Sequence, residues 1–283
     1  MDELAGTLFH RWYVSLFGLA FCVFAVRHLG WRRAAVYALV AFGVGALAEN
    51  GSATVGFPYT RYEFNPALRG DELWIGDVPL FVPLSYTFMG YFAFAAGRML
   101  ASGPWRTRAA RPWQEFVLAW MLAVWALWVV DPMSRLGDEF YLGDVFGYEG
   151  PGFWFGLPLG SQLGFAFTSV VLLGLLFFLS RDEPDRPVTG IVRHPHVAAL
   201  VTWHVQVFHI AVIGLLIGAD AIAGSAVLMW VPAAAVTAVH WSHLRHQPGP
   251  VSPVALKARA TGDGDGEGAP DARLVEPMGR RSV

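Results

Sequence analysis

The sequence is poor in charge, cysteine and lysine, and each shortage excludes a class of protein. Only 15% of its 283 residues are Asp, Glu, Lys or Arg, against roughly 25% in a soluble domain. The single cysteine, Cys22, cannot form an intrachain disulfide, and a thiolate metal cluster is not expected. The single lysine, Lys257, lies outside every apolar run, so no helix can carry a retinal Schiff base.

Motifs for nucleotides and nucleic acids are also missing. The chain has no P-loop, no glycine-rich dinucleotide fingerprint and no Gly-x-Ser-x-Gly elbow. The net charge of −2 offers no basic surface for nucleic acid. An enzyme with this sequence would therefore work without a nucleotide and without a nucleic-acid partner.

What the sequence has in abundance is apolar residues, which make up 55% of the chain and give a mean hydropathy of +0.44. Seven runs approach the roughly 20 residues that cross a bilayer core, where helices must pair every backbone group. They are Phe9–Val26, Trp31–Ala48, Pro79–Leu100, Trp113–Val130, Gly160–Leu179, Val197–Gly218 and Ala221–Trp241. The sequence thus predicts an all-α, polytopic membrane helix bundle with about seven transmembrane helices and two long structured outer loops.

Arginines are unevenly divided between the two sides of this bundle. Most of them lie in every second loop between consecutive apolar runs, and loops rich in arginine are expected on the cytoplasmic side. The arginine-rich side carries Arg27, Arg32, Arg33, Arg98, Arg106, Arg108, Arg111, Arg181, Arg186 and Arg193. The other side carries Arg11, Arg61, Arg69 and Arg135. The N-terminus is therefore predicted outside and the C-terminus in the cytoplasm.

The composition changes after His246. Residues 247–283 are rich in Gly, Pro, Ala and charge and almost without aromatics, which is typical of a disordered segment. We therefore expect a transmembrane helical domain over residues 1–246 and a disordered cytoplasmic tail over residues 247–283.

Two outer connections, Glu49–Val78 and Asp131–Leu159, are too long to be simple turns. Both mix carboxylates with Tyr, Phe, Trp, Gly and Pro, so their aromatics need burial at the membrane interface or in a lid over the bundle. Only about 15 apolar residues precede each opening carboxylate, roughly 22 Å of helix in a 30 Å core. Glu49 and Asp131 should therefore lie at or below the interface.

Carboxyl groups at that depth have two interpretations. They line a cavity or pathway, where a carboxyl held out of water is a usable proton donor near neutral pH. Alternatively, each ends a helix and pairs with a loop arginine such as Arg61 or Arg135. Other loop residues could support such chemistry, although most residues of this kind are solvated surface. They are Asp138 and Glu139, with Tyr59 and Tyr62 as proton-relay or orienting groups or as ordinary interface anchors.

Seven of the nine histidines fall in the last third of the chain, and His240 and His243 lie one helical turn apart. A histidine–metal oxidoreductase acting on a lipid or carotenoid is therefore an alternative. The repeated two-histidine boxes and carboxylate partners of such sites are missing, so we expect no metal and assign these histidines to interhelical hydrogen bonds.

The outer connections also carry a set of short motifs. They are Glu49, Gly56-Phe57-Pro58-Tyr59, Tyr62, Val78-Pro-Leu-Phe-Val-Pro83, Asp131-Pro132-Met133, and Phe155-Gly-Leu-Pro-Leu159 followed by Gly164. In these motifs the chain resembles the membrane carotenoid 1,2-hydratases, typified by bisanhydrobacterioruberin hydratase and γ-carotene hydratase. The resemblance covers residues 35–240.

This resemblance implies an activity in carotenoid biosynthesis within a bacterial or archaeal cell membrane. The reaction adds water across the terminal C1=C2 bond of an acyclic carotenoid end group, gives a tertiary alcohol, and needs no redox cofactor. One carboxyl protonates C2 and a second acts as base or holds the water. Either Glu49 or Asp131 could be the acid, with Asp138, Glu139, Tyr59 and Tyr62 in support.

The partners implied are a long polyene substrate and membrane lipid. Aromatic faces would bind the polyene and stabilise the cation. The candidates are Phe57, Trp74, Tyr86, Trp154 and Phe155. A non-catalytic carotenoid-binding or assembly subunit is the second alternative. The carotenoid, the side of the membrane at which the chemistry occurs and the oligomeric state are left open.

Overall fold

The computed structural model describes residues 3–102, 112–141, 143–148, 152–181 and 195–245. The side chains of residues 195–196, 240 and 243–245 lie outside the description, as does the predicted tail, residues 247–283. All described residues belong to the unit Met1–His246.

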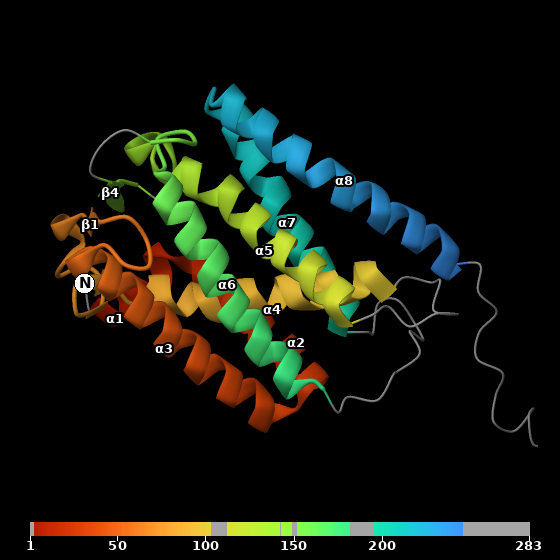
Figure 1. Cartoon of the computed structure of the whole chain (residues 1–283). Helices are drawn as coiled ribbons and strands as arrows, with labels where there is room; N and C mark the ends of the chain where they lie inside the picture. The colour runs from red at the N-terminus through yellow and green to blue at the C-terminus, as the bar shows by residue number, and fades with distance from the viewer. Residues whose placement is uncertain (1–2, 103–111, 142, 149–151, 182–194, 246–283) are drawn as a thin grey trace, which may run out of the picture. The chain divides into compact units, whose positions relative to one another are not determined.

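The unit is an all-α helix bundle, as predicted (Figure 1). A short helix α1 (Glu3–His10) precedes seven long helices, one for each predicted apolar run. They are α2 (Trp12–Leu29), α3 (Trp31–Val55), α4 (Phe81–Ser102), α5 (Pro112–Ser134), α6 (Leu159–Leu179), α7 (Pro195–Leu216) and α8 (Asp220–Arg245). Among the described residues, every long helix except α4 is long and apolar enough to span a membrane. The bundle thus has the architecture of an integral membrane protein.

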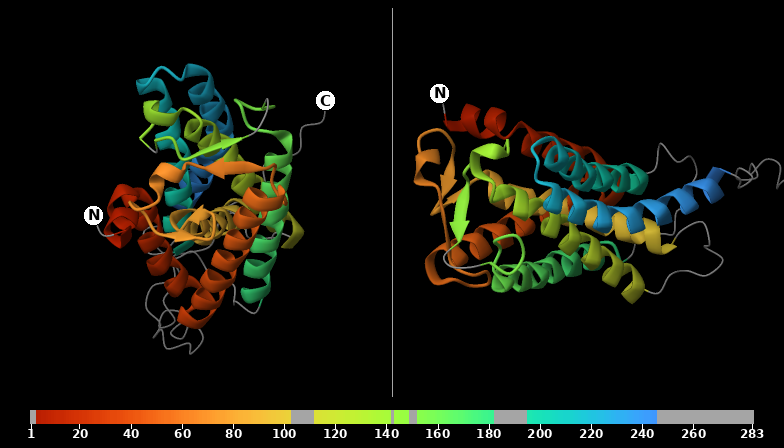
Figure 2. Two further views of the ribbon diagram at one scale, coloured as in Figure 1. Left: turned by 90° about the vertical axis from the view of Figure 1, so that its left-hand side faces the viewer. Right: turned by 90° about the horizontal axis from the view of Figure 1, so that it is seen from above.

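Helix α4 carries Ser85, Tyr86, Thr87 and Arg98, and it falls short of the hydropathy that marks the other long helices as candidate spans. It is nevertheless the core of the bundle, since it packs against α2, α3, α5 and α7 (Figure 2). Its residues Tyr91–Ala96 have no exposed surface. The other helices surround α4 and shield its polar side chains, and two of these, Ser85 and Tyr86, line an interior cavity.

Two helices continue further than their apolar runs predict. Helix α3 passes Ala48 and ends at Val55, where Gly56 takes a left-handed cap conformation with φ 76°. Helix α5 passes Val130 and ends at Ser134. Glu49 and Asp131 therefore lie within helices, with their backbones fixed, rather than at the start of a loop.

The two outer loops are structured and joined to each other, as expected of a lid. Strand β1 (Tyr62–Phe64) in the first loop pairs antiparallel with β4 (Phe146–Tyr148) in the second (Figure 1). Tyr62 lies opposite Tyr148, and Phe64 lies opposite Phe146. The first loop also contains the 3-10 helix Pro66–Leu68 and a hairpin of β2 (Trp74–Ile75) and β3 (Val78–Pro79), and the second contains the 3-10 helix Gly137–Glu139. We call the β1–β4 pair and its flanking residues the lid.

The N-terminal segment holds the first loop in place. Arg11, between α1 and α2, donates to Glu72 Oε1 at 2.9 Å, and both side chains are buried. The backbone N–H of Leu73 donates to Thr7 Oγ1 at 2.8 Å. Gly6 packs so closely that a Cβ there would meet the carbonyl oxygen of Asp71. Removal of either partner would leave an uncompensated buried charge, which costs about 3–5 kcal/mol, so the pair ties the first loop to the N-terminal segment.

Candidate functional site

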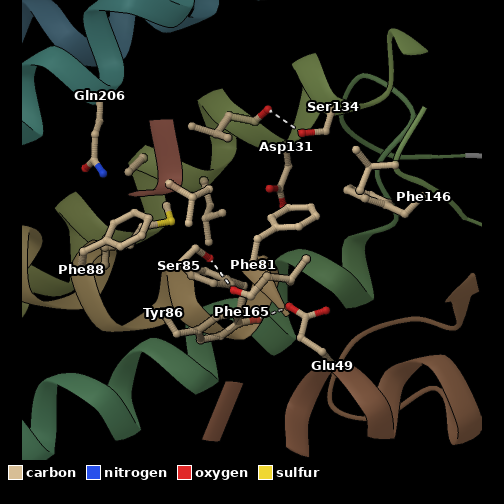
Figure 3. A pocket seen from close by; sticks show the side chains of 18 of the residues that line it. Glu49, Phe81, Ser85, Tyr86, Phe88, Asp131, Ser134, Phe146, Phe165 and Gln206 are labelled. Atoms are coloured by element: carbon tan, nitrogen blue, oxygen red, sulfur yellow. Dashed lines mark hydrogen bonds between the residues drawn. The ribbon is translucent and has the colours of Figure 1, made fainter. Parts of the chain in front are cut away.

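A cavity of about 190 Å³ lies under the lid and is lined by side chains of α2 to α7 and of both outer loops (Figure 3). Its lining is mostly apolar and aromatic, with a few polar groups that converge on the interior. Cavities for drug-sized ligands measure roughly 300–1,000 Å³. This smaller cavity suits the end of a long apolar molecule rather than the whole of it.

Glu49 points into the cavity from α3 and is 7% exposed. The Tyr62 hydroxyl from the lid donates to its Oε2 atom, and the Tyr86 hydroxyl from α4 donates to its Oε1 atom. Both carboxyl oxygens therefore have a phenol partner, which supports negative charge on the group.

Tyr59 extends this set of hydrogen bonds towards α6. Its hydroxyl lies 2.6 Å from that of Tyr86 and 3.1 Å from Thr168 Oγ1. Its backbone N–H donates to Ser52 Oγ at 3.0 Å. Burial raises the pKa of Tyr59 above its ordinary value of 10, and the nearby Glu49 adds to the rise. The phenol therefore keeps its proton at physiological pH and remains a hydrogen-bond donor.

A half-buried tyrosine closes the lid side of the cavity. The hydroxyl of Tyr148 in β4 lies 2.6 Å from Ser161 Oγ in α6. Burial, reinforced by Asp131, raises the pKa of Tyr148 above 10 as well. This contact joins the lid to the helices beneath it.

Asp131 enters the cavity from α5 (Figure 3). Among the described residues its carboxyl has no hydrogen-bond or ion-pair partner. Arg135, one turn further along the chain, lies over the Tyr148 ring at 5.8 Å instead. Arg61 is exposed, and Glu49 bonds to tyrosines. The alternative interpretation was an ion pair between each carboxyl and a loop arginine. In the described part of the chain neither Glu49 nor Asp131 forms such a pair.

The structure thus brings together five of the residues singled out in the sequence. They are Glu49, Tyr59, Tyr62, Tyr86 and Asp131, and all five line the cavity.

Six other candidates lie elsewhere. Asp138 and Glu139 are exposed in the 3-10 helix of the second loop, and Phe57 is 68% exposed. Trp74 packs against Phe64 and the guanidinium of Arg69. Trp154 donates to the Trp128 carbonyl oxygen at 3.0 Å and packs against Phe155. None of the six is among the residues that line the cavity.

Several cavity residues were missed by the sequence analysis. The aromatic wall is formed by residues of α4, α6 and the lid, among them Phe81, Phe165, Phe146 and Tyr148. On α6, polar residues at helical spacing within an apolar run were an available signal. They are Ser161 and Ser169, which line the cavity, and Thr168, which bonds to Tyr59, and all three are buried.

Gln206 is a further missed residue. It lies in the middle of the apolar helix α7, is 5% exposed, and points into the cavity (Figure 3). Within the described part of the chain its amide has no hydrogen-bond partner. A polar residue in an apolar run is costly and is often functional, which would have marked it in the sequence.

The described histidines make interhelical or loop contacts. His204 lies 2.8 Å from Thr237 Oγ1 on α8, and His209 lies 3.2 Å from the Tyr141 hydroxyl. In the described ranges no three His, Cys, Asp or Glu side chains form a metal-binding group. The side chains of His194, His196, His240, His243 and His246 lie outside the description, so the histidine–metal alternative stays a prediction.

Fold and site together define a polytopic membrane protein with a lidded, aromatic cavity that holds two carboxyl groups. A sequence model described as "carotenoid biosynthesis protein" matches residues 9–250. The chain belongs to this carotenoid biosynthesis protein family, as the resemblance of its loop motifs indicated. No curated protein and no solved structure matches the chain.

Proposed function

We propose that the protein is a carotenoid 1,2-hydratase, a hydro-lyase that adds water to the C1=C2 bond of an acyclic carotenoid end group. The observation that carries the proposal is the pair of carboxyl groups, Glu49 and Asp131, directed into one aromatic cavity. Hydration of an alkene needs one group that gives a proton and one that takes a proton, and no redox cofactor.

The surroundings of the two carboxyls suggest how the roles are divided. Two phenols donate to Glu49, which suits a group that is charged before it acts as base. Asp131 has no donor among the described residues, and charging an unpaired carboxyl in an apolar cavity is costly. We therefore assign Asp131 as the acid and Glu49 as the base.

The proposed reaction begins when Asp131 transfers its proton to C2, which leaves a tertiary cation at C1. The ring faces of Phe165 and Phe146 line the cavity and would stabilise this cation. A water molecule held by Glu49 attacks C1 and gives its proton to Glu49. The product is the tertiary alcohol.

The lid and the size of the cavity also fit this chemistry. Tyr62 and Tyr148 cover the carboxyls, and a covered site strengthens electrostatic interactions and excludes competing water. A cavity of about 190 Å³ would admit the reacting end while the rest of the polyene lies among the helices and lipid.

We further propose the topology indicated by the arginines: N-terminus outside, C-terminus and tail in the cytoplasm, in a bacterial or archaeal membrane. The lid and the catalytic carboxyls would then lie at the outer side.

The test is expression in a host that makes lycopene-type precursors, followed by mass spectrometry of the pigments. The wild type is expected to add the mass of one water molecule per hydrated end, without a requirement for iron or oxygen. Asp131→Asn and Glu49→Gln should each lower the rate by about 10²–10⁴-fold, the contribution of general acid–base catalysis. Asp138→Asn, a carboxyl outside the cavity, is the matched control and should retain the wild-type rate.

Full conversion by both cavity variants would refute the assignment. Bound pigment without conversion would instead support a carotenoid-binding subunit. A product that requires iron and oxygen would support the histidine–metal alternative.

A further inference from the structure

A chain of hydroxyl groups connects Glu49 to helix α6. The Tyr86 hydroxyl contacts Glu49 Oε1, the Tyr59 hydroxyl lies 2.6 Å from that of Tyr86, and Thr168 Oγ1 lies 3.1 Å from Tyr59. Thr168 Oγ1 also lies 2.9 Å from the carbonyl oxygen of Gly164 in its own helix. We call these three hydroxyls the hydroxyl chain.

Each hydroxyl has a single proton to donate, so the direction of donation between Glu49 and the two tyrosines follows the charge of Glu49. If Glu49 is ionised, Tyr86 donates to Glu49 and Tyr59 donates to Tyr86, while Thr168 donates to the Gly164 carbonyl oxygen or to Tyr59. If Glu49 is protonated, it donates to Tyr86, Tyr86 to Tyr59, Tyr59 to Thr168, and Thr168 to the Gly164 carbonyl oxygen. In both directions every proton of the chain has an acceptor.

Thr168 is the member that makes the reversal possible. Its oxygen accepts the Tyr59 proton when Glu49 is protonated, and its own proton still has the Gly164 carbonyl oxygen as acceptor, so the two tyrosine hydroxyls can turn away from Glu49. Tyr62 donates to the other carboxyl oxygen in both cases and is unaffected. We propose that Thr168 is a positioning residue that allows Glu49 to hold either protonation state without movement of any heavy atom.

The packing around the chain keeps those heavy atoms in place. Gly164 lies so close to the loop before Tyr59 that a Cβ there would meet the carbonyl oxygen of Pro58. Ser52 holds the backbone N–H of Tyr59 from the other side and donates to the Ala48 carbonyl oxygen at 2.7 Å. Because the oxygens are fixed, only hydroxyl rotation is left to follow a change of charge at Glu49.

This inference rests on the proposed function and explains how its base can accept a proton. When water attacks C1, a C–O bond forms, one O–H bond of the water breaks, and an O–H bond forms on Glu49. The hydroxyl chain reverses by rotation of hydroxyls alone, so the site meets the new charge without movement of heavy atoms, which keeps the reorganisation cost small. A cavity water then returns the proton from Glu49 to Asp131 and resets both carboxyls.

The first test measures kcat and KM for Thr168→Val, which keeps the side-chain shape and removes the hydroxyl. We expect a kcat loss of about tenfold, the effect of one buried hydrogen bond, with KM unchanged. Thr168→Ser should restore most of the rate. Thr87→Val is the matched control, because Thr87 is a buried threonine that bonds to Leu84 and does not line the cavity.

A double-mutant cycle separates an action through Tyr59 from a general loss of stability. Tyr59→Phe breaks the same chain, so Thr168→Val should cost little more in the Tyr59→Phe background. Fully additive losses would overturn the proposal.

A second readout does not depend on catalysis. The infrared C=O stretching band of protonated Glu49, identified by its loss in Glu49→Gln, should shift in Thr168→Val and stay unchanged in Thr87→Val. An unshifted band, or no protonated Glu49 at any pH at which the protein is folded, would overturn the proposal. A shifted band in a protein without hydratase activity would retain the hydroxyl chain and reject the proposed reaction.

Discussion

At the scale of single residues, two carboxyls with the same sequence signature have different surroundings. Glu49 and Asp131 each follow a short apolar run. Tyrosine hydroxyls donate hydrogen bonds to both carboxyl oxygens of Glu49, whereas Asp131 faces the cavity without a hydrogen-bond partner among the described residues. The same chemical group can thus serve as base in one place and as acid in the other.

Gln206 provides a prediction at this scale. An amide that faces an apolar ligand without a hydrogen-bond partner weakens binding, because its desolvation costs about 1–3 kcal/mol. We expect Gln206→Met, which has a similar shape, to bind a hydrocarbon carotenoid more tightly by up to that amount. The measurement is quenching of tryptophan fluorescence by added carotenoid in nanodiscs.

Gln162→Met is the matched control for Gln206. Gln162 is also a buried glutamine, 3% exposed, but it does not line the cavity. Its replacement should leave carotenoid binding unchanged. Weaker binding by Gln206→Met would show that the amide bonds to a polar group of the ligand.

At the scale of structural elements, the decisive feature is the pairing of strands from two different loops. Tyr62 and Tyr148, 86 positions apart, lie opposite each other in the β1–β4 pair. One of them bonds to Glu49 and the other to Ser161, so the lid and the site form one unit. An entry route for a polyene must therefore pass either through this lid or between the helices.

A disulfide across the lid distinguishes these routes. Glu63 and Gly147 are register partners and both are exposed, and a Cβ at Gly147 would make only an ordinary contact, 3.9 Å from Arg135. Paired strand positions suit disulfide geometry. The variant combines Glu63→Cys and Gly147→Cys with Cys22→Ser. We expect it to retain its activity when the disulfide is formed, because the polyene enters from the lipid between helices.

The reduced form of the same variant is the control for this measurement. If oxidation abolishes activity and reduction restores it, the substrate enters through an opening lid. Failure to cross-link at all would contradict the β1–β4 register.

At the scale of the whole molecule, a helix that falls short of a candidate membrane span lies at the centre of the described bundle. Helix α4 brings Tyr86, Phe81 and Ser85 to the cavity, and the other helices provide the apolar surface that a membrane requires. A polar helix can cross a membrane when neighbouring helices shield it, since the cost of its hydroxyls is then met by internal hydrogen bonds.

The topology of the whole chain is testable with a fluorescent reporter that folds only in the cytoplasm. Because arginines are concentrated in alternate connections, we expect a fusion after residue 246 to be fluorescent. The same reporter fused to the N-terminus is the control and should be dark. The reverse result would place the lid at the cytoplasmic side.

Much of the architecture was predictable because hydropathy is a local property. Each long helix matches an apolar run, and the long loops with their opening carboxyls are visible in the sequence alone. Glu49 and Asp131 could be singled out because a carboxyl at the end of a short apolar run is costly unless it has a role. The sequence by itself therefore determined the helices, the loops and the two acidic positions.

Contacts between distant segments depended on tertiary structure. The pairing of β1 with β4 places Tyr148 opposite Tyr62 at the cavity, whereas Asp138 and Glu139 are exposed. The close approach of α6 to the first loop places Thr168 beside Tyr59. Tyr86 is a hydrogen-bond partner of Glu49 because α4 lies next to α3, which no local pattern encodes. Such contacts arise from packing between segments far apart in the chain, so only the folded molecule decides which polar groups meet.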